Sequence, residues 1–281
     1  MKMLIIGGTS SLGRSLRNIL SQSGEVITAG RRDCDIKLDL GDLNAFIDLP
    51  LGLDVVINTA AQFGTSSSEE ILETEKVNVL GTLRLCQAAV RARVKHFILI
   101  SSIYSDLRNG ERNYTIYSLS KRHAEEVAAL YCFTHLLPLT ILKPSPLYGN
   151  GDGFKKHHPF LYTMIDKARK GEDITLFGSN DPLRNYLHID DFSEIIYRVA
   201  LNKVLGTYSC TYTSDVTYSQ IARAAYESFQ TNGKICHLTE KPDIPDNIFV
   251  KDFSLYEKID FYPKISIDDG LRKLAKERRF K

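Results

Sequence analysis

The chain has 281 residues, of which 43% are hydrophobic and 25% are charged, and its net charge at pH 7 is +2. This composition is typical of a globular protein with one large domain or slightly more, and the small net charge argues against a nucleic-acid-binding protein. No apolar stretch reaches the length of a membrane span or a signal peptide, and the five cysteines lack metal-ligand spacing. We therefore expect a cytoplasmic protein with reduced thiols, no metal site and no membrane contact.

Short apolar runs alternate with segments of helical periodicity in the first half of the chain. Strands are expected at residues 3–6, 26–29, 36–38, 54–58, 97–100 and 139–142, and helices at 12–22, 69–93 and 117–133. Strands that alternate with helices predict a parallel sheet covered on both faces. The predicted fold is α/β, with a Rossmann-type doubly wound parallel sheet.

The pattern changes after Gly149. We expect a loop over 150–158, a helix over 159–170, a strand over 174–177, a helix over 190–201, and short mixed elements beyond. Residues 1–149 are predicted to form the dinucleotide-binding and catalytic core, to which parts of the later chain return. Residues 150–281 are predicted to form mainly a smaller C-terminal substrate lobe.

The start of the chain has the order strand, tight turn, helix. Glycine permits close approach of a pyrophosphate to the backbone, and a helix that begins near Ser11 points N–H groups at that phosphate. Ser10 replaces the middle glycine of the usual fingerprint, so a plain turn before a helix is the alternative. The cofactor-binding residues expected here are Gly7, Thr9, Ser10, Ser11, Leu12 and Gly13.

Arg31 and Arg32 follow the second expected strand, where a carboxylate would bind the ribose hydroxyls of NAD. Guanidinium groups pair bidentately with phosphate oxygens, so two arginines suit the 2′-phosphate of NADP(H). We therefore predict that NADP(H) is favoured, with NAD(H) still possible. The alternative is a pair of surface arginines beside Asp33 and Asp35.

Tyr117 and Lys121 lie one helical turn apart and share a face of their expected helix, and Ser102 ends the preceding strand. The Lys121 ammonium is expected to stabilise a Tyr117 phenolate, which lowers the pKa of the phenol toward the operating pH. Tyr117 would then protonate a carbonyl oxygen as hydride reaches the carbon. Ser102 would donate a hydrogen bond to the same oxygen. These three residues are the predicted catalytic set.

The order of these motifs resembles the extended short-chain dehydrogenase/reductase family, in its nucleotide-sugar epimerase, dehydratase and reductase branch. The resemblance covers essentially the whole chain. Besides the glycine turn, it is carried by Asp39-Leu40, residues 56–62, Val77-Asn78 with Gly81-Thr82, residues 97–102, Tyr117 to Lys121, and residues 183–191.

The resemblance implies further roles. Asp39 and Leu40 would contact the adenine, and the strand that ends in Ala60, Ala61 and Gln62 would line the cofactor. Tyr117 and Lys121 would also belong to the cofactor site, with Lys121 on the nicotinamide ribose. The substrate-binding residues would be Ser102, Tyr117 and Arg184.

Arg184 would bind the diphosphate of a nucleotide sugar, with a surface ion pair to Asp181 as the alternative. His188, at the end of an apolar strand, is interpreted as a structural histidine. A homodimer through the helices at 69–93 and 117–133 is also implied by the resemblance.

Three departures from the family pattern bear on the substrate. Lys143 stands in place of an arginine, and Pro146 in place of an asparagine. The acidic pair that dehydratases place beside the catalytic hydroxyl is replaced by Ile103-Tyr104, which argues against a 4,6-dehydratase.

We therefore predict an NADPH-dependent reductase of a nucleotide-linked 4-keto-6-deoxy sugar. An NAD-dependent nucleotide-sugar 4-epimerase and a non-catalytic NADP-binding sensor are the alternatives, because fold alone does not fix function.

Overall fold

The computed structural model describes residues 1–150 and 152–279, which form two compact units. The first unit contains Met1–Pro144, Ser193–Cys210 and Asp252–Phe261. The second contains Ser145–Phe192, Thr211–Lys251 and the chain from Tyr262 onward. The chain thus returns twice to its first unit.

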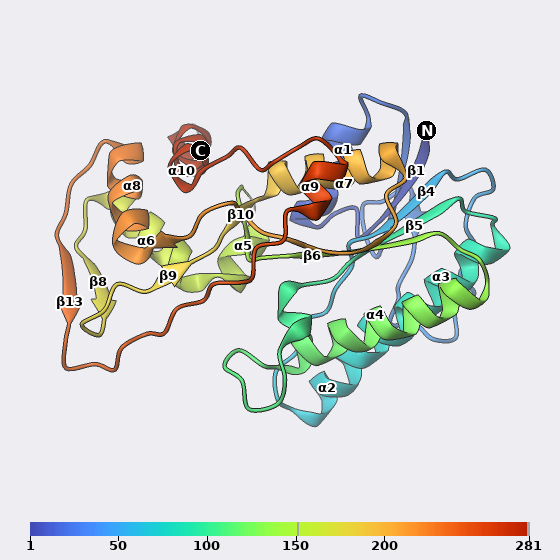
Figure 1. Ribbon diagram of the computed structural model, residues 1–281, viewed down its shortest axis with the longest axis horizontal. Helices are drawn as coiled ribbons and strands as arrows, with labels where there is room; N and C mark the ends of the chain where they lie inside the picture. The colour runs from blue at the N-terminus through green and yellow to red at the C-terminus, as the bar shows by residue number, and fades with distance from the viewer. Residues whose placement is uncertain (151, 280–281) are drawn as a thin grey trace. The chain divides into compact units, whose positions relative to one another are not determined.

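A seven-stranded parallel sheet forms the centre of the first unit (Figure 1). Its strands are β1 (Lys2–Ile6), β2 (Glu25–Gly30), β3 (Ile36–Lys37), β4 (Val55–Asn58), β5 (His96–Ile100), β6 (Leu139–Pro144) and β11 (Gly206–Cys210). The spatial order is β11-β6-β5-β4-β1-β2-β3. This order confirms the predicted doubly wound Rossmann-type sheet. The strand β11 was not predicted.

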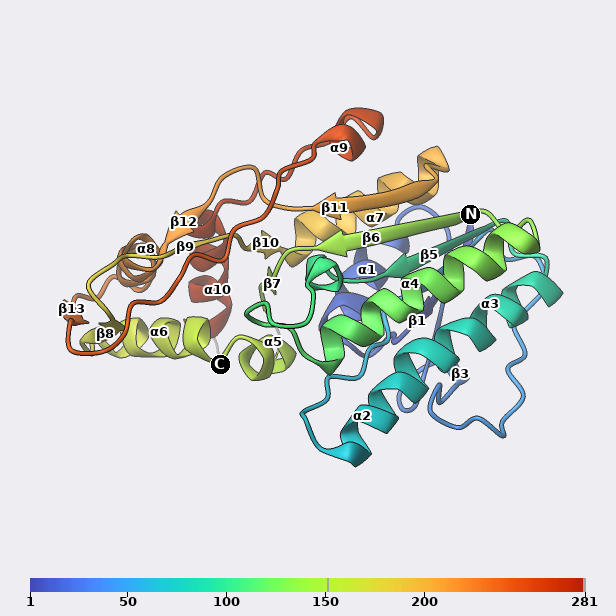
Figure 2. The same cartoon turned by 60° about the horizontal axis from the view of Figure 1, so that its bottom comes forward.

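Helices cover both faces of this sheet, with α3 and α4 on one face and α1 and the later part of α7 on the other (Figures 1 and 2). Their bounds are α1 (Ser11–Leu20), α2 (Ser68–Glu75), α3 (Gly81–Arg91), α4 (Ile116–Thr134), α7 (Ile189–Asn202) and α9 (Ser254–Lys258), with a 3₁₀ turn η2 (Ile103–Asp106) before α4. The central strands are buried on both sides: all five residues of β5 are inaccessible to solvent or nearly so. This explains why they are continuous apolar runs instead of alternating ones.

The helix expected over 69–93 is interrupted by a π-helical segment, η1 (Lys76–Leu80), between α2 and α3. A π-helical turn is rare and often marks a functional site, because the extra residue re-aims a side chain. Here the segment contains Asn78, which is 3% exposed.

The second unit is built from small sheets and helices. Its elements are β7 (Leu147–Tyr148), α5 (Asp152–His157), α6 (Pro159–Lys170), β8 (Ile174–Phe177), β9 (Leu183–Arg184), β10 (Leu187–His188), β12 (Val216–Thr217), α8 (Tyr218–Phe229), β13 (Ile235–Leu238) and α10 (Ile267–Arg279). The pairs are β7 with β10, β9 with β12 and β8 with β13.

Two expectations for this region were wrong. Part of the predicted loop over 150–158 is the helix α5, and the region after 201 contains two long helices, α8 and α10, where short elements were expected. The signal for α8 was present, because Thr217 and Gln220 form a reciprocal capping box at its start. Among the described residues, no helix is long and apolar enough to cross a membrane.

Candidate active site

The expected cofactor and catalytic residues of the first unit follow the carboxyl ends of neighbouring strands. In a doubly wound sheet, ligands bind outside these ends at the point where strand order reverses. That point lies between β1 and β4, which pair in register from Met3 with Val55 to Ile6 with Asn58. The turns after β1, β4 and β5 carry the residues described below.

The turn after β1 is shaped for a close ligand. Gly7 has a φ of +83°, and a Cβ on Gly13 would stand 2.3 Å from the Gly7 carbonyl oxygen, so both positions require glycine. Ser10 caps α1, since its Oγ accepts a hydrogen bond from the Gly13 N–H at 2.9 Å. The departure from the glycine fingerprint is therefore a capping residue.

The same turn has an unsatisfied group. The Ser11 Oγ is buried and has no hydrogen-bond partner among the described residues, although buried hydroxyls are normally paired. It stands at the N-terminus of α1, where backbone N–H groups and the helix dipole favour an anion. The turn therefore fits a dinucleotide pyrophosphate, with Thr9 and Leu12 as its other expected members.

The turn after β4 is fixed by Asn78 from the π-helical segment. The Asn78 amide accepts from the Gln62 N–H at 2.7 Å and donates to the Gln62 carbonyl oxygen at 2.9 Å. It also donates to the Ser120 Oγ at 2.9 Å, which links this turn to α4. Ala60 is held by the Asn58 side chain at 3.2 Å. Asn78 is part of a sequence motif that resembles the family, but its hydrogen bonds to Gln62 and Ser120 were not predicted.

Arg31 and Arg32 lie directly after β2, and both are exposed. Within the described parts of the chain, neither guanidinium has a hydrogen bond or an ion pair. The Asp35 carboxylate instead accepts from the Thr28 N–H and hydroxyl at 2.8 and 2.7 Å, which lowers the pKa of Asp35. Both a 2′-phosphate site and the alternative of a pair of surface arginines beside Asp33 and Asp35 are compatible with this arrangement.

Asp39 and Leu40, the expected adenine contact, form a tight turn. The Asp39 carboxylate accepts from the Gly41 N–H at 2.9 Å, while Leu40 is buried in the core. A Cβ on Gly81 would come 2.8 Å from the Leu40 Cβ, so α3 packs closely against this turn. The adenine contact itself stays a prediction.

Ser102, Tyr117 and Lys121 come together at the ends of β5 and the start of α4. The Ser102 side chain acts on the Tyr117 phenol and opposes the rise of its pKa. Lys121 is 4% exposed, donates to the Ile100 carbonyl oxygen at 2.8 Å, and has its Nζ 5.8 Å from the centre of the Tyr117 ring. The Phe63 ring stacks on the Tyr117 ring at 4.3 Å and 12°. This contact was not foreseen from the sequence.

The electrostatics of this set differ from the expectation. Burial raises the pKa of the Tyr117 phenol, and the Ser102 side chain only partly opposes that rise. Burial also lowers the pKa of Lys121 to about 8, against the opposing effect of the Glu125 carboxylate. The predicted lowering of the Tyr117 pKa by Lys121 was wrong for the cofactor-free protein. The Lys121 ammonium faces the Ile100 carbonyl oxygen and the Tyr117 ring, and the effect of burial on the Tyr117 pKa is the larger one.

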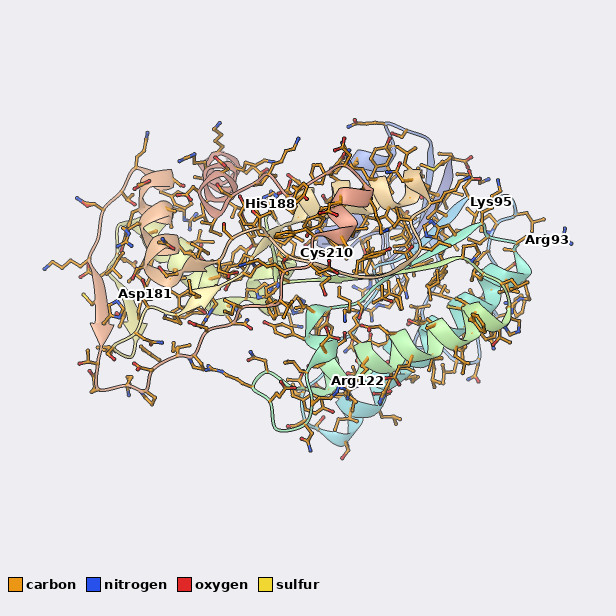
Figure 3. All side chains as sticks on the ribbon, viewed as in Figure 1. Arg93, Lys95, Arg122, Asp181, His188 and Cys210 are labelled. Carbon is orange, nitrogen blue, oxygen red and sulfur yellow. The ribbon has the colours of Figure 1, made fainter. Side chains whose placement is uncertain are left out.

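Arg122 fixes the segment between Ser102 and Tyr117. It extends from α4, where Figure 3 labels it, and donates to the Leu107 carbonyl oxygen at 2.8 Å. Asp106, the first acid after Ser102, pairs with the Lys143 ammonium at 2.5 and 2.6 Å. Its charge is therefore already engaged.

The second unit contains the other expected substrate residue. Arg184 is 6% exposed, lies 4.3 Å above the Tyr218 ring, and donates through Nη1 to the Leu183 and Pro245 carbonyl oxygens. It does not pair with Asp181, which accepts from the Ser219 N–H. The surface ion pair weighed for Arg184 is thus replaced by a stacked, buried guanidinium.

His188 is held as a structural residue. Its Nδ1 lies 3.2 Å from the Asp190 N–H and its ring meets the edge of Tyr148. Burial lowers the pKa of the imidazole to about 4, so it is neutral at pH 7. A cavity of about 370 Å³ elsewhere in the second unit is lined by none of the expected site residues.

The comparisons with known proteins agree with this geometry. Residues 3–210 match the model of the NAD dependent epimerase/dehydratase family. The chain belongs to this family. Membership supports a nicotinamide cofactor, and the glycine turn and the orphaned Ser11 hydroxyl fit one.

The curated relatives of this chain are named for different reactions. It is 22% identical over 202 residues to the CDP-abequose synthase of Salmonella typhimurium, an alignment that covers 67% of this chain and 66% of the relative. It is 28% identical over 192 residues to the UDP-glucose 4-epimerase of Vibrio cholerae, covering 59% and 57%. The chain thus spans about two thirds or less of these two relatives.

Solved structures share the fold along nearly the whole chain. WbmF of Bordetella bronchiseptica in complex with NADH has a TM-score of 0.85 at 21% identity, and covers 100% of this chain and 92% of its own. RMD of Pseudomonas aeruginosa with NADPH has a TM-score of 0.80 at 18% identity, covering 99% and 98%. Among the described residues, no group of three or more His, Cys, Asp or Glu residues could hold a metal ion.

Proposed function

We propose that the protein catalyses the NADPH-dependent reduction of a nucleotide-linked 4-keto-6-deoxy sugar. The observation that carries the choice of NADPH is the pair Arg31 and Arg32. Both guanidiniums are exposed directly after β2 and have no partner among the described residues, while the neighbouring Asp35 is engaged by Thr28. A 2′-phosphate is the anion that the cofactor would bring to this position.

The cofactor choice is tested by the double variant R31A/R32A. Loss of charge-assisted hydrogen bonds to a phosphate is expected to weaken NADPH binding by about ten- to a hundredfold and to leave NADH binding within about threefold. R93A is the matched control, because Arg93 is an exposed arginine, labelled in Figure 3, between the end of α3 and the start of β5, whereas Arg31 and Arg32 follow the carboxyl end of β2. Fluorescence titration measures both affinities. Equal or tighter binding of NADH to the wild-type protein would overturn this cofactor choice.

The catalytic residues act on a carbonyl group. The nicotinamide, when bound, supplies the hydride. Because its pKa is raised, the Tyr117 phenol keeps its proton at neutral pH and can donate it to the sugar's carbonyl oxygen as charge develops there. Ser102, whose side chain acts on the Tyr117 phenol, donates a hydrogen bond to that oxygen and orients it.

Reduction is favoured over dehydration because no acidic residue directly follows Ser102 in the sequence. Ile103 and Tyr104 follow it, and Asp106 is paired with Lys143. CDP-abequose synthases are among the relatives, which agrees with an enzyme of deoxy-sugar synthesis.

The reaction is tested by following NADPH oxidation with a panel of nucleotide-linked 4-keto-6-deoxy sugars, with Y117F as the control. Turnover with one of them that is lost in Y117F is the expected result, and it would also identify the nucleotide. A panel without turnover would contradict the proposed substrate class.

An epimerase is the second candidate, because UDP-glucose 4-epimerases are also relatives and structural neighbours. It uses the same three catalytic residues but returns the hydride to the substrate. Change of stereochemistry at C4 without net consumption of NAD(P)H would identify it.

On the substrate side, we propose that Arg184 binds the diphosphate. Its stacking on Tyr218 and its bonds through Nη1 preorganise the guanidinium, and its other nitrogens have no hydrogen bond within the described residues. We also propose a homodimer through α2, α3 and α4. Leu130 and Phe133 at the end of α4 are 71% and 84% exposed, and analytical ultracentrifugation tests whether a partner covers them.

A further inference from the structure

The Phe63 ring lies directly against the catalytic phenol, and the reaction as derived gives it no role. Phe63 follows Gln62 in the turn after β4, and its ring is stacked on the Tyr117 ring. The two ring centres are 4.3 Å apart and the ring planes are within 12° of parallel. Phe63 is nevertheless 45% exposed, and Tyr117 is half-buried. Because the Phe63 ring is only partly covered, core packing alone does not account for its position.

A chain of hydrogen bonds joins the backbone before Phe63 to the backbone of Tyr117. The Asn78 amide accepts from the Gln62 N–H at 2.7 Å and donates to the Gln62 carbonyl oxygen at 2.9 Å. It also donates to the Ser120 Oγ at 2.9 Å, and the Ser120 hydroxyl donates to the Tyr117 carbonyl oxygen at 3.0 Å. The stack of the two rings closes this chain into a loop. The turn after β4 and the first turn of α4 are thus joined both by hydrogen bonds and by the aromatic rings.

The residue after Phe63 is also held closely. A Cβ on Gly64 would stand 2.2 Å from Thr74 Oγ1 on α2 and 3.0 Å from the Ile116 Cγ2, so the chain passes tightly between these two helices. Ile116 is the first residue of α4 and directly precedes Tyr117. The backbone is therefore fixed on both sides of Phe63, which keeps its ring beside the phenol.

A stacked ring restrains the Tyr117 side chain. The phenol is attached to α4 through rotatable single bonds, and its hydroxyl must stay in one place to give its proton to a carbonyl oxygen. The Lys121 Nζ lies 5.8 Å from the centre of the Tyr117 ring, whereas the Phe63 ring covers one of its faces at 4.3 Å. Stacked aromatic pairs have a preferred geometry, so rotation of Tyr117 away from Phe63 loses a favourable contact.

We propose that Phe63 is a positioning residue, whose ring holds the Tyr117 phenol in the orientation from which it donates its proton. The stack also links the phenol to the turn after β4, which is expected to line the cofactor. The catalytic part of this role rests on the proposed function. The restraint on the Tyr117 ring does not, and it can be measured without substrate or cofactor.

The first test measures the motion of Tyr117 by ¹³C relaxation in protein carrying [ε-¹³C]tyrosine, with the signal assigned by Y117F. F63M replaces the ring with a flexible apolar side chain, and F63Y keeps a ring. In F63M we expect a lower order parameter for the Tyr117 ring, and a downfield shift of its ring protons because the stacked face no longer shields them. F63Y should resemble the wild type in both. An unchanged Tyr117 order parameter in F63M would overturn the proposal.

F46M is the matched control for the loss of a ring. Phe46 is 75% exposed in the loop between β3 and β4, and its ring lies 4.7 Å from the Arg91 guanidinium. Its replacement is expected to leave the Tyr117 signal and the turnover unchanged.

The second test is turnover with the keto sugar that the panel identifies. A misdirected proton donor slows the chemical step, so F63M should lower kcat about three- to tenfold and leave KM within about twofold. F63Y is expected to retain kcat within about twofold of the wild type, because it keeps the stack.

Two results of the second test would contradict the proposal. Greater motion of Tyr117 in F63M with an unchanged kcat would make the stack purely structural. A raised KM with an unchanged kcat would assign Phe63 to substrate binding instead. If no sugar of the panel is turned over, the proposed function fails, while the relaxation measurement still decides whether Phe63 holds Tyr117.

Discussion

Replacing Asn78 with alanine is expected to damage both stability and the cofactor site. Asn78 is 3% exposed and makes three hydrogen bonds, two to the Gln62 backbone at 2.7 and 2.9 Å and one to Ser120 at 2.9 Å. Ser120 keeps a second partner, the Tyr117 carbonyl oxygen at 3.0 Å, so its loss is small. In N78A, the Gln62 N–H and C=O lose their hydrogen bonds to the Asn78 side chain.

The magnitude follows from those two backbone groups. An orphaned buried polar group costs about 1–3 kcal/mol and the Gln62 groups are only part-buried, so N78A should lower the free energy of unfolding by about 1–3 kcal/mol. The turn from Ala60 to Gln62, expected to line the cofactor, also loses its link to α4. We therefore expect weaker binding of the nicotinamide cofactor as well.

Urea unfolding and fluorescence titration with NADPH measure the two effects. N18A is the control: Asn18 is exposed on α1, and its removal should change stability by no more than about 0.5 kcal/mol. A loss in N78A no larger than that in N18A would show that the clamp on Gln62 does not contribute to stability.

Three further predictions concern other parts of the first unit. Burial lowers the pKa of His96 to about 4, below the value of about 6.5 in an unfolded chain. The unfolded chain therefore binds the proton first, so stability present above pH 6.5 is lost as the pH falls toward 4. This loss is about 2 kcal/mol at pH 5. In urea unfolding, the difference in the free energy of unfolding between pH 7.5 and pH 5 should therefore be about 2 kcal/mol smaller in H96Q than in the wild type. In G13A, a Cβ 2.3 Å from the Gly7 carbonyl oxygen should weaken NADPH binding about tenfold or more, and unchanged affinity in a titration would contradict this. Because burial raises the pKa of Tyr117, the ultraviolet difference titration between wild type and Y117F should show no phenolate below about pH 10 in cofactor-free protein.

The sequence by itself determined six of the seven strands of the first unit's sheet, all but β11, and the order of its motifs. Buried parallel strands are short apolar runs such as Leu4–Ile6 and Phe97–Ile100, and a run of this kind identifies a strand without knowledge of its neighbours. The spacing of Tyr117 and Lys121 likewise fixed their shared helical face. The region after Gly149 was less predictable, since its strands are mostly two to four residues long and leave little periodicity to detect.

Only the tertiary structure decided how the site residues are held and charged. The π-helical turn that aims Asn78 at Gln62, and the Ser101–Glu125 contact, join residues far apart in the chain. The pKa of Tyr117 rises because packing removes water from the phenol, and no local pattern reports that burial. Hydrogen-bond partners and desolvation are properties of the folded surroundings, whereas strand and helix periodicity are properties of the chain.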